Sequence, residues 1–181
     1  MESDSEDLLL AGAGDEAALH RLLATWRQPV YAAFERTREP SAAAEAAEGV
    51  FAGLLRTSGA RRGEAPFGDR LWLAVWRALK DEPAAERATI PARRLADSVG
   101  ARTAALRGAV ASLPPAERAL FLFTRIGGLS LSDAARITGV PEEEARGLLV
   151  RAFDALRVSL GAVLDLVASP DPTATPARGQ A

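Results

Sequence analysis

Apolar residues in this chain recur at intervals of three and four, and no stretch alternates apolar and polar residues with the period of two that a strand requires. This spacing predicts an all-α fold. The clearest case is a single apolar stripe formed by Leu19, Leu22, Leu23, Trp26, Val30 and Phe34. Because Pro29 lies inside the stripe, we expect the helix to kink or restart there.

Capping residues predict where the helices begin. Asp15 is expected to cap the first helix, and Ser41 the next, which runs to about Thr57. Asp69 is expected to open a short helix that carries Trp72 and Trp76. A loop is expected over 58–66, where glycines and a proline cluster.

The order of these signals divides the 181 residues into two helical modules. The first module is expected over 1–80 and the second over 103–168. Residues 81–102 contain prolines and mixed charges and are predicted to be a linker. The proline-rich tail over 169–181 is expected to be disordered.

Composition narrows the classes of function. The chain has no cysteine and one histidine, His20, so neither a metal site nor a cofactor is expected. No paired carboxylates, phosphate-binding glycine loop or nucleophile–base pair is evident, so we do not expect an enzyme. The acidic start and the lack of any apolar run near 18 residues favour a cytoplasmic protein.

The formal net charge of −2 constrains any contact with nucleic acid. A nucleic-acid role would have to depend on a local basic patch, or on a partner that supplies the missing positive charge.

Residues 128–157 carry the most specific pattern. Ser130 with Asp133 forms a capping-box signature, and the helix that follows stops at Gly139. A second helix has its apolar face at Ala145, Leu149, Ala152 and Leu156, and the small Ala135 is expected where the two helices cross. The pattern is that of a helix-turn-helix, although an ordinary helical hairpin uses the same caps.

Two blocks of sequence resemble the extracytoplasmic-function (ECF) sigma factors. The run Leu-Pro-Pro-Ala-Glu-Arg-Ala-Leu-Phe-Leu at 113–122, followed by Gly-Leu-Ser-Leu-Ser-Asp-Ala-Ala-Arg-Ile-Thr-Gly-Val at 128–140, is similar to the fourth conserved region of that family. Ala-Gly-Asp-Glu-Ala-Ala-Leu at 13–19, Val-Tyr at 30–31 and Arg-Gly-Glu-Ala-Pro-Phe at 62–67 are similar to words of its second region.

The resemblance implies a dissociable subunit of bacterial RNA polymerase that directs transcription from specific promoters. Its implied partners are the polymerase core, promoter DNA and an anti-sigma factor. By the same resemblance, residues 44–55 would dock on polymerase, 67–80 would hold the melted strand, and 141–157 would enter the major groove. Within the docking helix only Glu45, Glu48 and Phe51 match the family pattern.

The expected recognition helix departs from the family. Glu142, Glu143 and Glu144 place acids at its start, and only Arg146 and Arg151 are basic nearby. Leu148 and Phe153 are apolar on the face expected to be exposed, which suits a protein contact better than a DNA contact. The DNA-facing residues predicted in this module are Ser130, Glu143, Glu144, Arg146, Gly147, Leu148 and Arg151.

In the first module Trp72 and Trp76 are either core residues or platforms for an unpaired promoter base. The local cationic cluster, either a DNA-binding surface or a solvated face, is formed by Arg61, Arg62, Arg70, Arg77 and Lys80. Two other interpretations stay open: a degenerate sigma-like protein that binds other proteins without reading a promoter, and an unrelated helix-turn-helix repressor.

Overall fold

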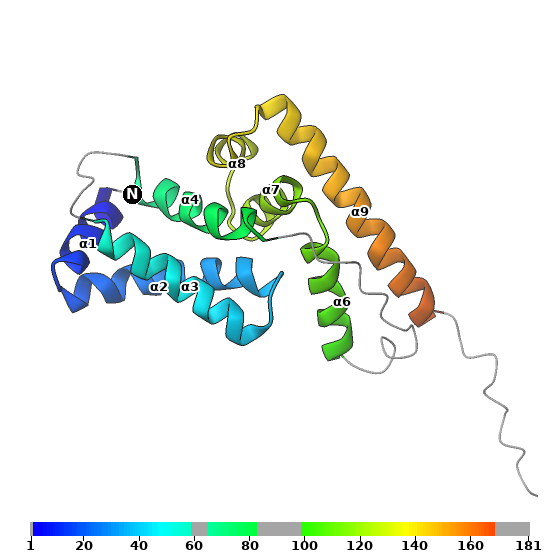
Figure 1. Ribbon diagram of the computed structural model, residues 1–181, viewed down its shortest axis with the longest axis horizontal. Helices are drawn as coiled ribbons and strands as arrows, with labels where there is room; N and C mark the ends of the chain where they lie inside the picture. The colour runs from blue at the N-terminus through cyan, green and yellow to red at the C-terminus, as the bar shows by residue number, and fades with distance from the viewer. Residues whose placement is uncertain (1, 59–64, 83–98, 169–181) are drawn as a thin grey trace, which may run out of the picture.

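The computed structural model describes residues 2–58, 65–82 and 99–168, and all regular structure in these ranges is α-helical (Figure 1). The prediction of an all-α fold is therefore confirmed. The described helices are α1 (Glu2–Gly12), α2 (Glu16–Glu35), α3 (Pro40–Arg56), α4 (Phe67–Lys80), α6 (Val99–Ala111), α7 (Pro115–Arg125), α8 (Leu131–Thr138) and α9 (Glu142–Ala168).

The first four helices pack around a common apolar core. Asp15 caps α2 as predicted, since its carboxylate accepts hydrogen bonds from the backbone N–H groups of Ala17 and Ala18 at 2.9 and 3.1 Å. Helix α1 was not predicted from the sequence. It is held by Leu8, which is buried, and by Asp7, which accepts from the Arg21 Nε at 3.1 Å.

Three sequence predictions about helices differ from the structure in whole or in part. A kink or a restart was expected at Pro29, and α2 does not restart there, since Leu22 before the proline and Phe34 after it are buried in the same core. Ser41 does not cap α3, because that helix starts with Pro40, whose fixed φ suits the first helical position. Helix α4 starts at Phe67, which leaves Asp69 inside the first turn.

The last three helices form a compact group around α7. Pro115 occupies the first turn of α7, as its sequence position predicts. Helix α8 is short, and α9 is a 27-residue helix that packs against α6, α7 and α8 and continues well beyond the predicted end of the recognition helix (Figure 1).

The two groups of helices are not separated in space, although two distinct modules were expected. Helix α4 packs against α7 and α8 (Figure 1), and the buried apolar residues of both groups form one cluster. At the contact, the rings of Trp72 and Phe123 lie 5.1 Å apart, centroid to centroid. An ion pair of 2.9 Å joins Asp69 on α4 to Arg136 on α8.

Several predictions fall on residues outside the described ranges. These are most of the linker at 81–102, the tail at 169–181, and the cations Arg61 and Arg62. Across the ranges that are described, no helix has the length and apolar character needed to cross a membrane.

Candidate nucleic-acid interface

The turn between α8 and α9 has the geometry that the sequence predicts for a helix-turn-helix. The Ser130 hydroxyl accepts from the Asp133 backbone N–H at 3.1 Å and donates to the Asp133 carboxylate at 2.6 Å. Gly139 ends α8 with a φ of 74°, a left-handed conformation that favours glycine. Ala135 is buried at 3% exposure, which lets the two helices approach closely.

The electrostatics at the start of α8 favour an ionised Asp133. The hydrogen bond from Ser130 lowers the pKa of the Asp133 carboxyl, and the guanidinium of Arg136 lowers it further. Arg136 bridges Asp133 and Asp69, so it connects the cap of α8 to helix α4. The cap of α8 is therefore a charged network rather than a single bond.

The first turns of α9 present most of the predicted DNA-facing residues to solvent. Glu143, Glu144, Arg146 and Gly147 are all exposed. Arg151 is exposed too, although its Nε donates to the nearly buried Glu117 carboxylate at 3.0 Å. The free surface of this helix start is therefore mixed in charge and not strongly basic.

Leu148 was predicted to lie on the exposed face of α9, and this is wrong. It is 8% exposed and shares the buried face of the helix with Ala145, Ala152 and Leu156. Phe153 is 36% exposed, and it packs edge-on against Phe121 with the Arg125 guanidinium 4.8 Å from its ring centroid.

On α4, the structure separates the two tryptophans. Trp72 is 2% exposed and packs against Phe123, so it is a core residue in this conformation and cannot stack on a base. Trp76 is half-buried, while Arg77 and Lys80 are exposed. Arg70 is half-buried, and one of its guanidinium nitrogens, Nη2, has no hydrogen-bond partner.

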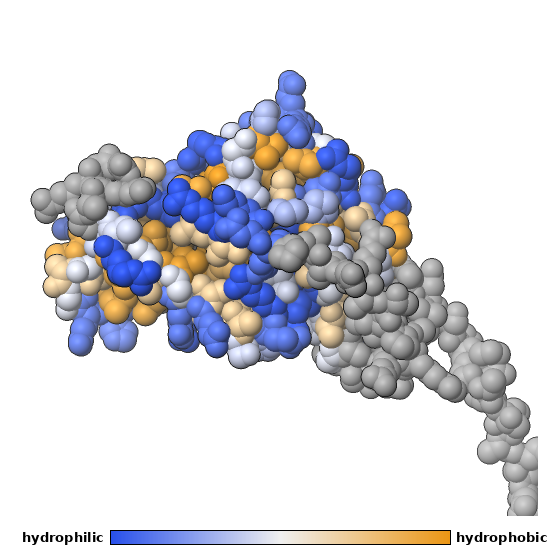
Figure 2. Space-filling model, in the orientation of Figure 1, coloured by the Kyte–Doolittle hydropathy of each residue, from blue (hydrophilic) through white to orange (hydrophobic). Residues whose placement is uncertain are grey.

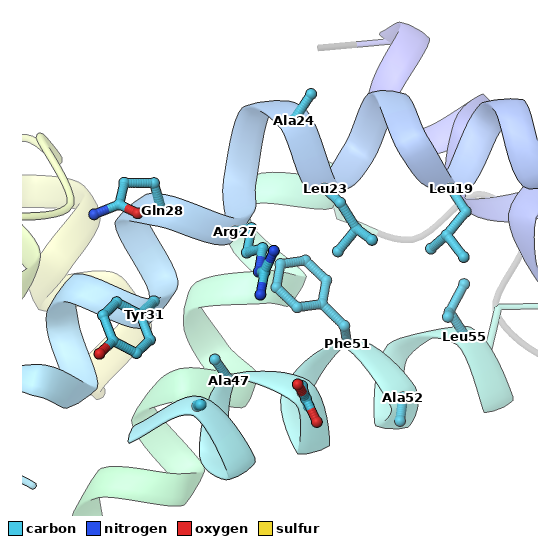
Figure 3. Close-up of a pocket in the computed structure, with 12 residues that line it drawn as sticks. Leu19, Leu23, Ala24, Arg27, Gln28, Tyr31, Ala47, Phe51, Ala52 and Leu55 are labelled. Carbon is cyan, nitrogen blue, oxygen red and sulfur yellow. The ribbon is translucent and has the colours of Figure 1, made fainter. Parts of the chain in front are cut away.

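Two of the three predicted polymerase-docking residues, Glu48 and Phe51, line a cavity of about 620 Å³ between α2 and α3 (Figure 3). Glu45 and Glu48 are exposed, and Glu48 lines the cavity. Phe51 is buried at 8% exposure, yet its ring faces the cavity (Figure 3). Hydrophobic residues gather over the α2–α3 part of the molecular surface (Figure 2).

Sequence reasoning missed the α2 side of this cavity, which is lined by Leu19, Leu23 and Tyr31. The signal was present, because the apolar stripe of α2 is wider than one buried face. Leu22, Val30 and Phe34 fill the core, so the remaining apolar residues are left at the surface. Among the described residues, no group of side chains is arranged to hold a metal ion.

The sequence also gave no indication of the role of Arg118, which is 1% exposed. Its guanidinium donates to the backbone carbonyls of Ala111 at 3.1 Å, Leu79 at 2.8 Å and Glu82 at 2.9 Å. Burial lowers the pKa of Arg118. These bonds connect the C-terminal ends of α4 and α6, where the Leu79 carbonyl also accepts from the backbone N–H groups of Asp81 and Glu82.

Comparison with known proteins finds a family model that matches the C-terminal part of the chain. Residues 103–156 match the family model described as Sigma-70, region 4. No curated protein sequence matches the chain. Among solved structures, CnrH in complex with the cytosolic domain of CnrY is similar, with a TM-score of 0.64 and 20% sequence identity over 88% of this chain and 98% of that one. The segment 103–156 is thus similar to region 4 of the sigma-70 factors, and the chain has the same fold as CnrH.

Proposed function

We propose that this protein is a sigma factor of the ECF type, which binds core RNA polymerase and directs transcription from specific promoters. One observation carries the proposal: the segment that matches sigma-70 region 4 forms a capped helix-turn-helix whose second helix exposes polar side chains. This role requires no catalysis by the chain itself, and it would be exercised in the cytoplasm, where polymerase acts.

The cavity between α2 and α3 is the proposed contact with polymerase. Its apolar lining can receive side chains of a partner helix, and the exposed Glu45 and Glu48 beside it can pair with cations of that partner. Phe51 closes the floor of the cavity and would touch the partner through the face of its ring.

The start of α9 is the proposed contact with promoter DNA. Arg146 is exposed and pairs with no carboxylate in the described part of the chain, so it is free to contact a guanine edge or a phosphate. Glu143 and Glu144 can accept from cytosine, whereas the partly engaged Arg151 is better placed to contact a phosphate. The Ser130 hydroxyl can donate a hydrogen bond to a DNA phosphate only if it breaks its hydrogen bond to the Asp133 carboxylate.

An anti-sigma factor is a further proposed partner. The similar protein CnrH was solved in complex with the cytosolic domain of CnrY, so its fold accommodates a second chain. We propose that a protein of comparable role holds this chain inactive until a signal releases it.

In vitro transcription tests the proposal. The purified chain is added to core polymerase with a library of promoter fragments, and we expect transcripts from a limited set of promoters. Arg146→Ala should weaken binding to such a promoter by about 1–3 kcal/mol, which is roughly 5- to 150-fold, and relax one base position. Arg102→Ala, which removes an exposed arginine on α6 outside the segment expected to enter the major groove, is the matched control.

The second candidate function is a sigma-like protein that binds another protein and has lost promoter recognition. The exposed apolar side chains of Val150 and Phe153 on α9 favour it. If this candidate is correct, the transcription assay stays silent across the library. Val150→Asp would then abolish capture of a partner while Arg146→Ala leaves it unchanged. Because Leu148 is buried, substitutions there would test folding and not binding.

A further inference from the structure

Helix α9 carries most of the large apolar side chains that the described residues expose. Four such side chains are exposed, and three of them lie on α9, namely Val150 at 56%, Phe153 at 36% and Val158 at 66% exposure. Phe153 packs against Phe121 and Arg125, so it has partners within the chain. The two valines keep more than half of their surface in water, and apolar side chains that gather on one exposed surface indicate a contact with another molecule.

The two valines lie on the side of α9 that points away from the core. Helices α6, α7 and α8 pack against α9, which forms an edge of the molecule (Figure 1). At about 3.6 residues per turn, an arc of about 80° opposite the buried face of the helix holds Gly147, Val150, Asp154, Val158 and Gly161. The first four are exposed and Gly161 is half-buried. We call these five residues the outer face of α9.

The outer face reads the same in both directions from its central residue, Asp154. Val150 stands four positions before Asp154, and Val158 stands four positions after it. Gly147 stands seven positions before Asp154, and Gly161 stands seven after it. Two identical chains related by a two-fold axis present the same surface to each other, so such an interface must be self-complementary. When two copies of α9 pack antiparallel across Asp154, Val150 of each copy meets Val158 of the other.

The two glycines leave the helix backbone bare at both ends of the outer face. Glycine is disfavoured against alanine inside a helix, so its presence twice on one face needs a reason. Packing within the described chain supplies none, because a Cβ at Gly147 or at Gly161 would meet no atom within 4 Å beyond the backbone of its own helix. A second helix can approach closely over a bare backbone, and an antiparallel copy brings Gly147 opposite Gly161.

The charges beside the outer face are balanced. Arg157 pairs with Asp154 at 3.4 Å, and Arg151 pairs with Glu117 at 3.0 Å. The two positive and two negative charges cancel, so a second copy meets no net like charge as it approaches. Antiparallel packing brings the two Asp154 carboxylates together, but it also surrounds them with the arginines three positions before and after Asp154 in both copies. A parallel pair would instead place like charges side by side at all three positions.

We propose that α9 is a self-association surface, through which two copies of this chain form a symmetric antiparallel dimer centred on Asp154. One helix face of about 21 Å buries less area than a standard interface, so we expect a weak dimer that forms only at high protein concentration. The proposal goes beyond the proposed function, because the dimer needs neither polymerase nor promoter. If the proposed function is correct, the dimer also covers Gly147 in the DNA-facing part of α9 and excludes promoter DNA, and this consequence alone rests on the proposed function.

Sedimentation velocity of the full chain between about 1 µM and about 1 mM tests the proposal. We expect a shift from monomer to dimer as the concentration rises. Val158→Asp places a carboxylate at both ends of the antiparallel contact and should weaken the association at least tenfold. Leu10→Asp, the same substitution at an exposed apolar side chain of α1, is the matched control and should leave the association unchanged. Thermal unfolding checks that both variants fold.

Disulfide trapping tests the antiparallel arrangement. The chain has no cysteine, so each variant carries one thiol. Under mild oxidation Asp154→Cys should give a disulfide-linked dimer, because this position meets itself on the two-fold axis. In a mixture of Val150→Cys and Val158→Cys, the two variants should link to each other at least tenfold faster than either links to itself. Arg102→Cys, at an exposed position of α6, should stay monomeric.

Four outcomes would overturn the proposal. These are a chain that stays monomeric at every concentration, a dimer that survives Val158→Asp, a dimer that Leu10→Asp weakens equally, and a Val150→Cys variant that links to itself faster than to Val158→Cys. A monomeric chain that loses promoter binding with Val158→Asp would assign the outer face to DNA. Because a chain that never dimerises can still support transcription, the two proposals fail separately.

Discussion

At the scale of single residues, loss of the Arg118 side chain should strongly lower the free energy of unfolding. Arg118 is almost fully buried, and two of its three hydrogen bonds to carbonyls are buried as well, so Arg118→Ala removes these bonds from the interior and opens a cavity. We expect the free energy of unfolding to fall by roughly 3 kcal/mol, measured by chemical denaturation. Arg157→Ala, at an exposed position, should change it by less than about 0.5 kcal/mol. Equal effects of the two substitutions would contradict the structural role of Arg118.

Burial at single positions of α9 shows how far helical periodicity can predict. Spacings of three and four connect Ala145, Ala152 and Leu156 through either Leu148 or Leu149. Leu149 was predicted to lie on the buried face, whereas the structure buries Leu148 more deeply and leaves Leu149 half-buried. The choice depends on where α6 and α7 lie relative to α9, and that packing is not encoded in the periodicity of α9 itself.

At the scale of elements, the cap of α8 should make the stability of the protein depend on acid pH. The pKa of Asp133 in the folded protein lies below its ordinary value of 3.8, mainly through the Ser130 hydrogen bond. A lowered folded pKa gives stability that is fully present above pH 4 and is lost as the pH falls through the folded pKa. We therefore expect the melting temperature of Asp133→Asn to fall less than that of the wild type below pH 4. Parallel curves would show that this carboxylate contributes nothing.

The ends of helices could be predicted from the sequence where a side chain caps the helix, but not where tertiary packing sets how far the helix extends. Asp15 and Ser130 cap their helices through bonds that the sequence predicts. A kink or a restart was expected at Pro29, but α2 does not restart there, because residues on both sides of the proline are buried in one core. Helix α1 was missed because its apolar residues are few, and it is held in place by Leu8 and the Asp7–Arg21 pair.

At the scale of the whole molecule, the two groups of helices adopt a closed arrangement that conceals part of the proposed promoter-binding surface. Trp72 is covered by Phe123, and a Cβ at Gly127 would lie 2.8 Å from the Trp72 ring, so the contact is tight. Two separate groups of helices were predicted because apolar periodicity is a property of each helix alone and carries no information on how the groups pack together. Contacts such as Asp69–Arg136, 67 positions apart, leave no periodic signal. If the proposed function is correct, promoter engagement by α4 requires the groups to separate.

Covalent closure tests this requirement directly. The chain has no cysteine, so Asp69→Cys with Arg136→Cys introduces a single pair of thiols across the contact. A short thiol-reactive cross-linker with a cleavable disulfide should trap the closed arrangement. We expect the trapped protein to lose promoter-dependent transcription at least tenfold, and reductant to restore it. Each single-cysteine variant treated with the same reagent controls for modification and for loss of the ion pair. A trapped protein that transcribes as well as the reduced one would mean that α4 works without leaving α7 and α8.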